Sequence, residues 1–130
     1  MAALVITPVY VALTALLMVV LASRVARLRG KLRVSLGDGG SDLITVASRG
    51  FGNLTEYAPV VLLLLLMMEI GGVPALWLHI YGSIFIFFRV LHPLSLMQGG
   101  APKWKRISRV ISAAGTAVLL VIGAVVLLLM

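Results

Sequence analysis

The chain has 130 residues, of which 62% are hydrophobic, and its mean hydropathy is +1.16. Eleven lysines and arginines against four acidic residues give a net charge of +7, and there is no cysteine. This apolar content excludes an ordinary soluble domain of the same length, and the lack of cysteine excludes disulfides and thiol chemistry by the chain itself.

Four apolar segments approach the roughly 20 residues that cross a bilayer as a helix. The predicted spans are about 4–23, 42–71, 74–92 and 106–130. No cleavable signal peptide is expected, because the first apolar run lacks a basic region ahead of it and is long enough to span. The sequence therefore predicts an all-α, integral membrane four-helix bundle in which residues 1–130 form a single domain.

The first two helices have recognisable boundaries. The first opens near Pro8, a residue tolerated in an early helical turn, and continues beyond its apolar part into residues 23–33. A loop over residues 34–40, glycine-rich at 37–40, follows, and Ser41-Asp42 is the predicted N-cap of the second helix. Pro59 is expected to kink that helix, because proline removes one helical hydrogen bond.

The third and fourth helices are also marked by turn residues. Gly71-Gly72 ends the second helix and Pro74 opens the third, so these two helices are expected to be antiparallel neighbours. His92-Pro93 is expected to end or kink the third helix, and 98–102 to form a turn. The fourth helix begins near Arg106, and its small residues favour close packing against another helix.

The basic residues lie at one membrane surface once four spans are assigned. They occupy the loop after the first span and the loop between the third and fourth, with none in 1–23, 57–88 or 110–130. This distribution places both loops in the cytoplasm, and it favours contact with anionic lipid headgroups. A nucleic-acid role is disfavoured, because no aromatic pattern accompanies the charge.

Three polar residues stand at the mouth of the second apolar run. Arg49, Asn53 and Glu56 follow i, i+4, i+7 spacing and so share one helix face. Ionisable groups at this depth are costly, so they indicate a functional site by default. An arginine fork suits a carboxylate, and glutamate suits an ammonium. The structural alternative is an Arg–Asn–Glu cluster that only holds helices together.

Other polar residues carry weaker signals. His79 and His92 are 13 residues apart, a spacing that suggests no metal site. Glu69, near the external surface, is expected to be a surface or subunit-contact residue rather than part of the cytoplasmic site.

These residues resemble a known family. The pattern Arg49-x-x-x-Asn53-x-x-Glu56-Tyr57-x-Pro59 resembles the second-helix signature of the MAPEG family, the membrane-associated proteins in eicosanoid and glutathione metabolism. Arg89-Val90-Leu91-His92 resembles the family's third-helix motif, and Arg27-Leu28-Arg29 the basic end of its first helix. The resemblance covers nearly the whole chain and is closest to bacterial members.

The resemblance implies a homotrimer in the bacterial inner membrane, with glutathione as co-substrate bound between subunits on the cytoplasmic side. It implies a transferase or peroxidase acting on lipophilic electrophiles. The residues that it assigns to glutathione binding are Arg27, Arg49, Asn53, Glu56, Tyr57, Arg89 and His92. It assigns stabilisation of the glutathione thiolate to an arginine early in the fourth helix, where Arg106 and Arg109 are both candidates. Arg109 is favoured because it opens the final span.

Two alternatives remain beside this reading. One is a non-catalytic membrane protein with the MAPEG fold that binds a lipid or another anionic ligand. The other, a small multidrug exporter, calls for a membrane-embedded carboxylate in the first span, and residues 4–22 contain none.

Overall fold

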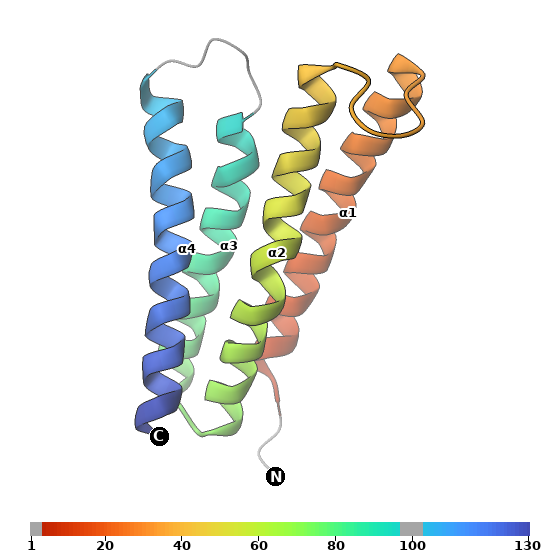
Figure 1. Ribbon diagram of the computed structural model, residues 1–130. Coiled ribbons are helices and arrows are strands. Elements are labelled where there is room, and N and C mark those ends of the chain that lie inside the picture. The colour runs from red at the N-terminus through yellow and green to blue at the C-terminus, as the bar shows by residue number, and fades with distance from the viewer. Residues whose placement is uncertain (1–3, 97–102) are drawn as a thin grey trace.

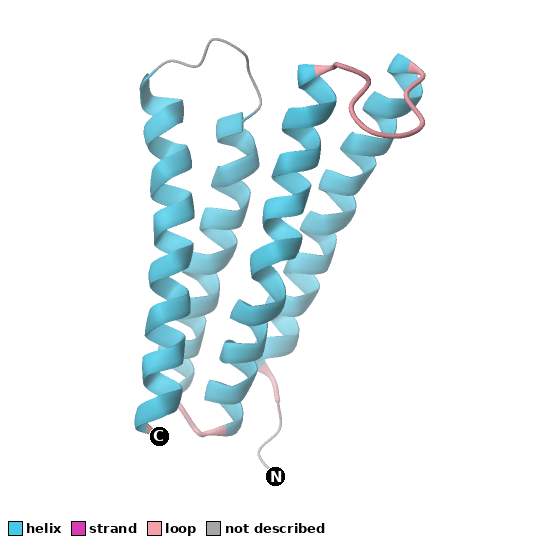
Figure 2. Cartoon of the chain, in the orientation of Figure 1, coloured by secondary structure: helices cyan, strands magenta, loops and turns pink. Residues whose placement is uncertain are grey.

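The computed structural model describes residues 4–96 and 103–130, without the side chain of Lys105. It contains four helices, which are α1 (Ile6–Leu32), α2 (Asp42–Ile70), α3 (Ala75–Leu96) and α4 (Lys103–Leu129). They run alternately up and down, and the two ends of the chain lie at the same end of the bundle (Figure 1). Each helix is long and apolar enough to cross a membrane, and the described part of the chain has no strand (Figure 2). The predicted all-α four-helix architecture is confirmed.

The helix ends differ from the predicted spans in informative ways. α1 extends well past residue 23 and ends where Arg33 adopts a left-handed conformation, with φ of 56°. α3 continues through Pro93 to Leu96, so of the two expectations for His92-Pro93 the end of the helix is wrong, and a kink at this point stays a prediction. The predicted turn at 98–102 lies outside the described residues.

α2 and α3 are joined by a tight turn, as the sequence predicts. Gly72 has a φ of +84°, a conformation that L side chains rarely adopt, and the Val73 N–H donates to the Met68 carbonyl oxygen at 3.0 Å. Pro74 then precedes α3, and the Trp77 N–H returns to the Pro74 carbonyl oxygen at 3.0 Å. This turn makes α2 and α3 adjacent antiparallel helices, side by side in Figure 1.

The N-terminus of α1 is capped by a side chain from the far end of α2. Glu69 Oε1 accepts the N–H groups of Val5 and Ile6, both at 2.8 Å, and Oε2 accepts the N–H of Thr7 at 2.6 Å. The first N–H groups of a helix have no partner within it, and a carboxylate is the strongest acceptor for them. Sequence reasoning treated Glu69 as a surface or contact residue and missed this role.

α2 begins differently from the prediction. Ser41 is the N-cap by position, but its side chain makes no capping hydrogen bond. Asp38 organises this end instead, because Oδ1 accepts the Gly40 N–H at 3.0 Å and Oδ2 accepts the Thr45 hydroxyl at 2.9 Å. The hydrogen bond from the Gly40 N–H, and after it the one from Thr45, lower the pKa of the Asp38 carboxyl below its usual value of 3.8.

Asp38→Ala is expected to loosen the start of α2 in a pH-dependent way. A lowered native pKa means that the ionised carboxylate stabilises the folded loop fully above pH 3.8, and that the effect is lost as pH falls through the lowered value. Hydrogen exchange at the amides of Gly40 and Ser41, corrected for intrinsic rates, should be faster in the variant at neutral pH. The difference should shrink in acid, and a difference independent of pH would contradict the assignment.

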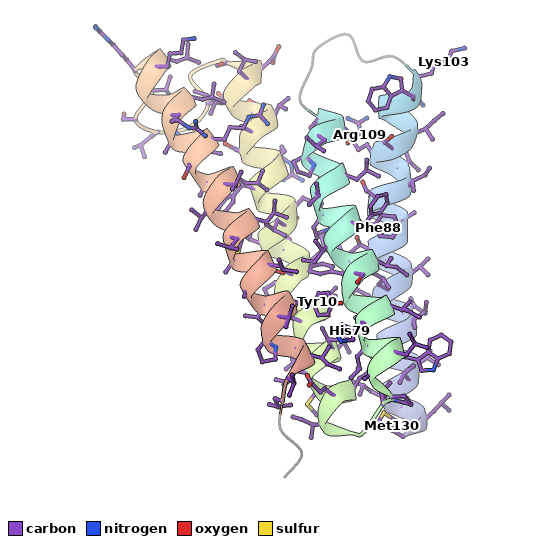
Figure 3. All side chains as sticks on the ribbon, turned by 180° about the vertical axis from the view of Figure 1, so that it is seen from behind. Tyr10, His79, Phe88, Lys103, Arg109 and Met130 are labelled. Carbon is purple, nitrogen blue, oxygen red and sulfur yellow. The ribbon has the colours of Figure 1, made fainter. Side chains whose placement is uncertain are left out.

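Close helix contacts occur at glycines. A Cβ on Gly82 of α3 would lie 2.5 Å from the ring of Tyr10 of α1, and one on Gly115 of α4 would lie 2.2 Å from the ring of Phe88 of α3. Figure 3 labels both aromatic side chains. The Tyr10 hydroxyl donates to the His79 carbonyl oxygen at 2.9 Å, which further joins α1 to α3. Gly115 therefore provides the close packing that the small residues of α4 predict.

Candidate functional site

Arg89 is the centre of a polar cluster in the basic half of the bundle. Only 1% of this residue is exposed, although it lies in a helix that could span a membrane. Its Nη1 donates to Asn53 Oδ1 of α2, while Nη2 donates to the Ser112 carbonyl oxygen of α4 at 3.1 Å and to the Thr116 hydroxyl. A buried guanidinium needs such acceptors, and these bonds join three helices.

Tyr57 covers the same guanidinium. Its ring centroid lies 5.5 Å from Arg89 Cζ, within the range of a cation–π interaction. Tyr57 is four residues beyond Asn53 on α2, so the two side chains reach Arg89 from successive turns of one helix. Two positions of the sequence motif, Asn53 and Tyr57, thus contact the same buried cation.

Arg49 and Glu56 form a separate, exposed pair on α2. Arg49 Nη1 lies 3.9 Å from Glu56 Oε1, and the side chains are 67% and 55% exposed. The prediction that they share a helix face is consistent with this geometry. A pair this long and this exposed adds little to stability, so both groups are available to a ligand or a second chain. The three-residue cluster expected from the sequence is therefore divided, with Asn53 turned to Arg89.

His92 lies one turn beyond Arg89 and is 8% exposed. Its Nδ1 has no hydrogen-bond partner among the described residues, and neither does Arg89 Nε. Buried polar atoms in native proteins normally have partners, and unpaired ones call for a specific explanation. Arg89, Arg109 and Arg49 all interact electrostatically with His92. A concentration of positive groups with unpaired polar atoms favours an anionic ligand.

The two candidate arginines of α4 differ in position. Arg109 is within electrostatic range of His92, whereas Arg106 lines a groove together with Lys103, Ile107 and Val110. Figure 3 labels Arg109 in the α3–α4 pair and shows Lys103 directed away from the bundle. Of the two, Arg109 is the one whose charge acts on His92, and its side chain is exposed.

Arg27 is not joined to this cluster by any described contact. Its side chain is exposed, and its Nε donates to the Ser23 carbonyl oxygen within α1 at 3.3 Å. Within residues 4–96 and 103–130, no group of three or more His, Asp or Glu side chains could hold a metal ion.

Ser112 and Thr116 were not identified from the sequence as site residues. Sequence reasoning treated them as small packing residues, yet both are fully buried and Thr116 accepts a hydrogen bond from Arg89. The available signal was two hydroxyl side chains at i, i+4 spacing within an apolar span, which places them on one face.

Comparisons with known proteins give consistent results. The model of the MAPEG family matches residues 7–126. "Inner membrane protein YecN" from Escherichia coli strain K12 is 37% identical over 87 residues, which are 67% of this chain and 66% of that protein; the same protein from E. coli O6:H1 strain CFT073 gives the same values. The matched region thus spans slightly less than two thirds of these relatives. No solved structure matches the chain.

Proposed function

Because this chain belongs to the MAPEG family, we propose that it is a membrane-bound, glutathione-dependent transferase or peroxidase that acts on lipophilic electrophiles. The observation that carries this proposal is the position of an exposed Arg49–Glu56 pair beside a buried cationic cluster with two unpaired polar atoms. Glutathione supplies two carboxylates and one ammonium, which are the groups that this arrangement can bind.

Within the proposed site the polar residues have different tasks. Arg49 binds a glutathione carboxylate and Glu56 the ammonium, and both are exposed enough to exchange their mutual contact for a ligand. Arg89 positions Asn53 and Tyr57 rather than reaching the ligand through Nη1 or Nη2, since both of these nitrogens already donate within the protein. His92 Nδ1 remains available for a further hydrogen bond.

Arg109 is the residue we assign to the sulfur. A guanidinium beside a thiol favours the ionised form, and the thiolate is the nucleophile. The electrophile, being apolar, reaches the site from the bilayer, whereas glutathione arrives from water. In conjugation the thiolate forms a carbon–sulfur bond while the electrophile loses its leaving group or, if it is an activated alkene, while its double bond opens and takes up a proton. In peroxide reduction the thiolate attacks one oxygen, the O–O bond breaks, and the other oxygen leaves as an alcohol after protonation. A second glutathione then converts the resulting sulfenic acid into glutathione disulfide and water.

The proposed setting is the inner membrane, with the basic loops in the cytoplasm, and the proposed assembly is a homotrimer with the site between subunits. The E. coli relatives are called inner membrane proteins, and the basic residues of this chain lie at one end of the bundle. The exposure of Arg49 and Glu56 in one chain leaves room for a neighbouring subunit to complete the site.

Arg49→Ala and Glu56→Ala are each expected to weaken glutathione binding by at least tenfold, because each removes a charged partner of the ligand. Calorimetry on the detergent-purified protein measures this directly. Lys31→Ala removes an exposed basic side chain from the end of α1 and serves as the control with unchanged binding. An unchanged affinity for glutathione in both site variants, with the oligomer intact, would contradict the proposal.

The second candidate is a non-catalytic MAPEG protein that holds a lipid or another anion in the same cluster. The concentration of Arg49, Arg89 and Arg109 around His92 favours any anion of suitable size, not glutathione alone. This candidate predicts a copurified anionic ligand, detectable by mass spectrometry, and no conjugation with any electrophile.

A further inference from the structure

The outer side of α4 carries a groove at the basic end of the bundle. Its lining residues are Lys103, Arg106, Ile107, Val110 and Ile111, and its volume is about 390 Å³. All five side chains are exposed in the single chain. Their helical positions place them on the side of α4 opposite Ser112 and Thr116, which face Arg89. The groove is thus separate from the polar cluster around Arg89.

Among the described residues, no acidic side chain lies within 4.0 Å of the basic groups of this groove. In the described part of the chain, Arg49–Glu56 is the one pair of oppositely charged side chains whose nitrogen and oxygen atoms lie within 4.0 Å of each other. Of the three remaining acidic residues, Glu69 caps α1 at the opposite end and Asp38 is bound by Gly40 and Thr45. The third, Asp42, lies in the first turn of α2 and makes no ion pair within 4.0 Å among the described residues. With a net charge of +7 and no ion pair at Lys103 or Arg106, both side chains are available to an anionic group of another molecule.

The groove has a polar end and an apolar end, in a fixed order. Lys103 and Arg106 lie in the first turn of α4, and Lys103 points away from the bundle (Figure 3). Val110 and Ile111 lie four and five residues beyond Arg106, about 6–8 Å deeper at the helical rise of 1.5 Å per residue. Trp104, beside the basic residues, is of the type enriched at membrane interfaces. The basic side chains thus lie where a lipid headgroup would lie, and the apolar side chains lie where its acyl chains would begin.

We propose that this groove binds an anionic phospholipid of the leaflet on the basic side of the protein. The phosphate lies between Lys103 and Arg106, and the upper part of an acyl chain lies along Ile107, Val110 and Ile111. The proposal does not depend on glutathione binding, because the groove and the cluster around Arg89 occupy opposite sides of α4.

A second copy of this chain fits the groove less well. At the level of Lys103 and Arg106, a second copy in the same orientation would present its own basic end, which repels these side chains. An anionic headgroup neutralises these side chains, while its acyl chain covers the apolar wall that would otherwise face the bilayer.

The test compares lipid retention by native mass spectrometry of the detergent-purified full chain. Phosphatidylglycerol and phosphatidylcholine with identical acyl chains are supplied at equal concentrations. The wild type is expected to retain phosphatidylglycerol preferentially. The Lys103→Gln/Arg106→Gln double variant should bind it about thirtyfold more weakly, as expected for two basic side chains near an anionic headgroup. Lys31→Gln/Arg33→Gln removes the same charge from the last turn and C-cap of α1 and should retain the preference.

Three results would overturn the proposal. They are equal retention of both lipids by the wild type, an equal loss in the two double variants, and unchanged retention in Lys103→Gln/Arg106→Gln. A change of oligomeric mass in that variant with unchanged lipid retention would instead assign the groove to a subunit interface. Thermal unfolding of each variant, compared with the wild type, separates loss of lipid from loss of fold.

Discussion

Arg89→Ala is expected to destabilise the bundle by about 3–5 kcal/mol, the largest loss of any single substitution considered. The substitution leaves Asn53 Oδ1 and the Thr116 hydroxyl without their donor in a dry interior, and it opens a cavity the size of a long side chain. It also removes the hydrogen bonds by which Arg89 joins α3 to α2 and α4. Thermal unfolding followed by circular dichroism in detergent measures the effect.

Two control variants make this result interpretable. Arg89→Lys keeps the charge but loses the planar fork that reaches two helices at once, so an intermediate loss is expected. Lys31→Ala, at an exposed position on α1, should unfold like the wild type. An unfolding temperature for Arg89→Ala within error of the wild type would show that the three-helix hydrogen bonds contribute nothing to stability.

Glu69→Ala is expected to destabilise the protein by about 2–3 kcal/mol. It removes the carboxylate that accepts the N–H groups of Val5, Ile6 and Thr7, and no other described side chain bonds to them. The loss of an N-terminal cap usually lowers the free energy of unfolding by up to about 2 kcal/mol. A larger loss is expected here, because this cap is charged and accepts three hydrogen bonds. Thermal unfolding gives the size of the effect, and faster hydrogen exchange at these three amides shows where it originates.

Glu69→Gln separates the contribution of shape from that of charge. The amide oxygen can still accept hydrogen bonds, but the NH₂ group cannot accept one, so part of the cap is lost together with the favourable charge at the helix N-terminus. The expected loss lies between those of the wild type and Glu69→Ala. Exchange rates unchanged in both variants would contradict the capping role.

The helices and their order follow from the sequence because long apolar runs and turn residues are local signals. Gly72 and Pro74 predict the α2–α3 turn, and the i, i+7 spacing places Arg49 beside Glu56. Asn53 does not join this pair, because its side-chain oxygen accepts a hydrogen bond from the buried guanidinium of Arg89 on the neighbouring helix. Which helix presents Arg89 to Asn53 depends on the rotation of α3, which no local pattern determines.

The same reason accounts for the other features that the sequence did not reveal. Glu69 and Thr7 are 62 residues apart, and no periodicity relates them. The choice between Arg106 and Arg109 depends on the rotation of α4, since the two residues lie about 60° apart around a helix. Thr116 is identifiable as a partner of Arg89 only after α3 and α4 are packed together.

The cap provided by Glu69 has a consequence for how the chain enters a membrane. During synthesis α1 is made first, and its leading N–H groups have no acceptor until a carboxylate more than 60 residues later has been synthesised. Water at the external surface can hydrate these groups in the meantime, but it is a weaker acceptor than a carboxylate. The smallest part of the chain that holds this end of α1 by its own hydrogen bonds is therefore the α1–α2 hairpin.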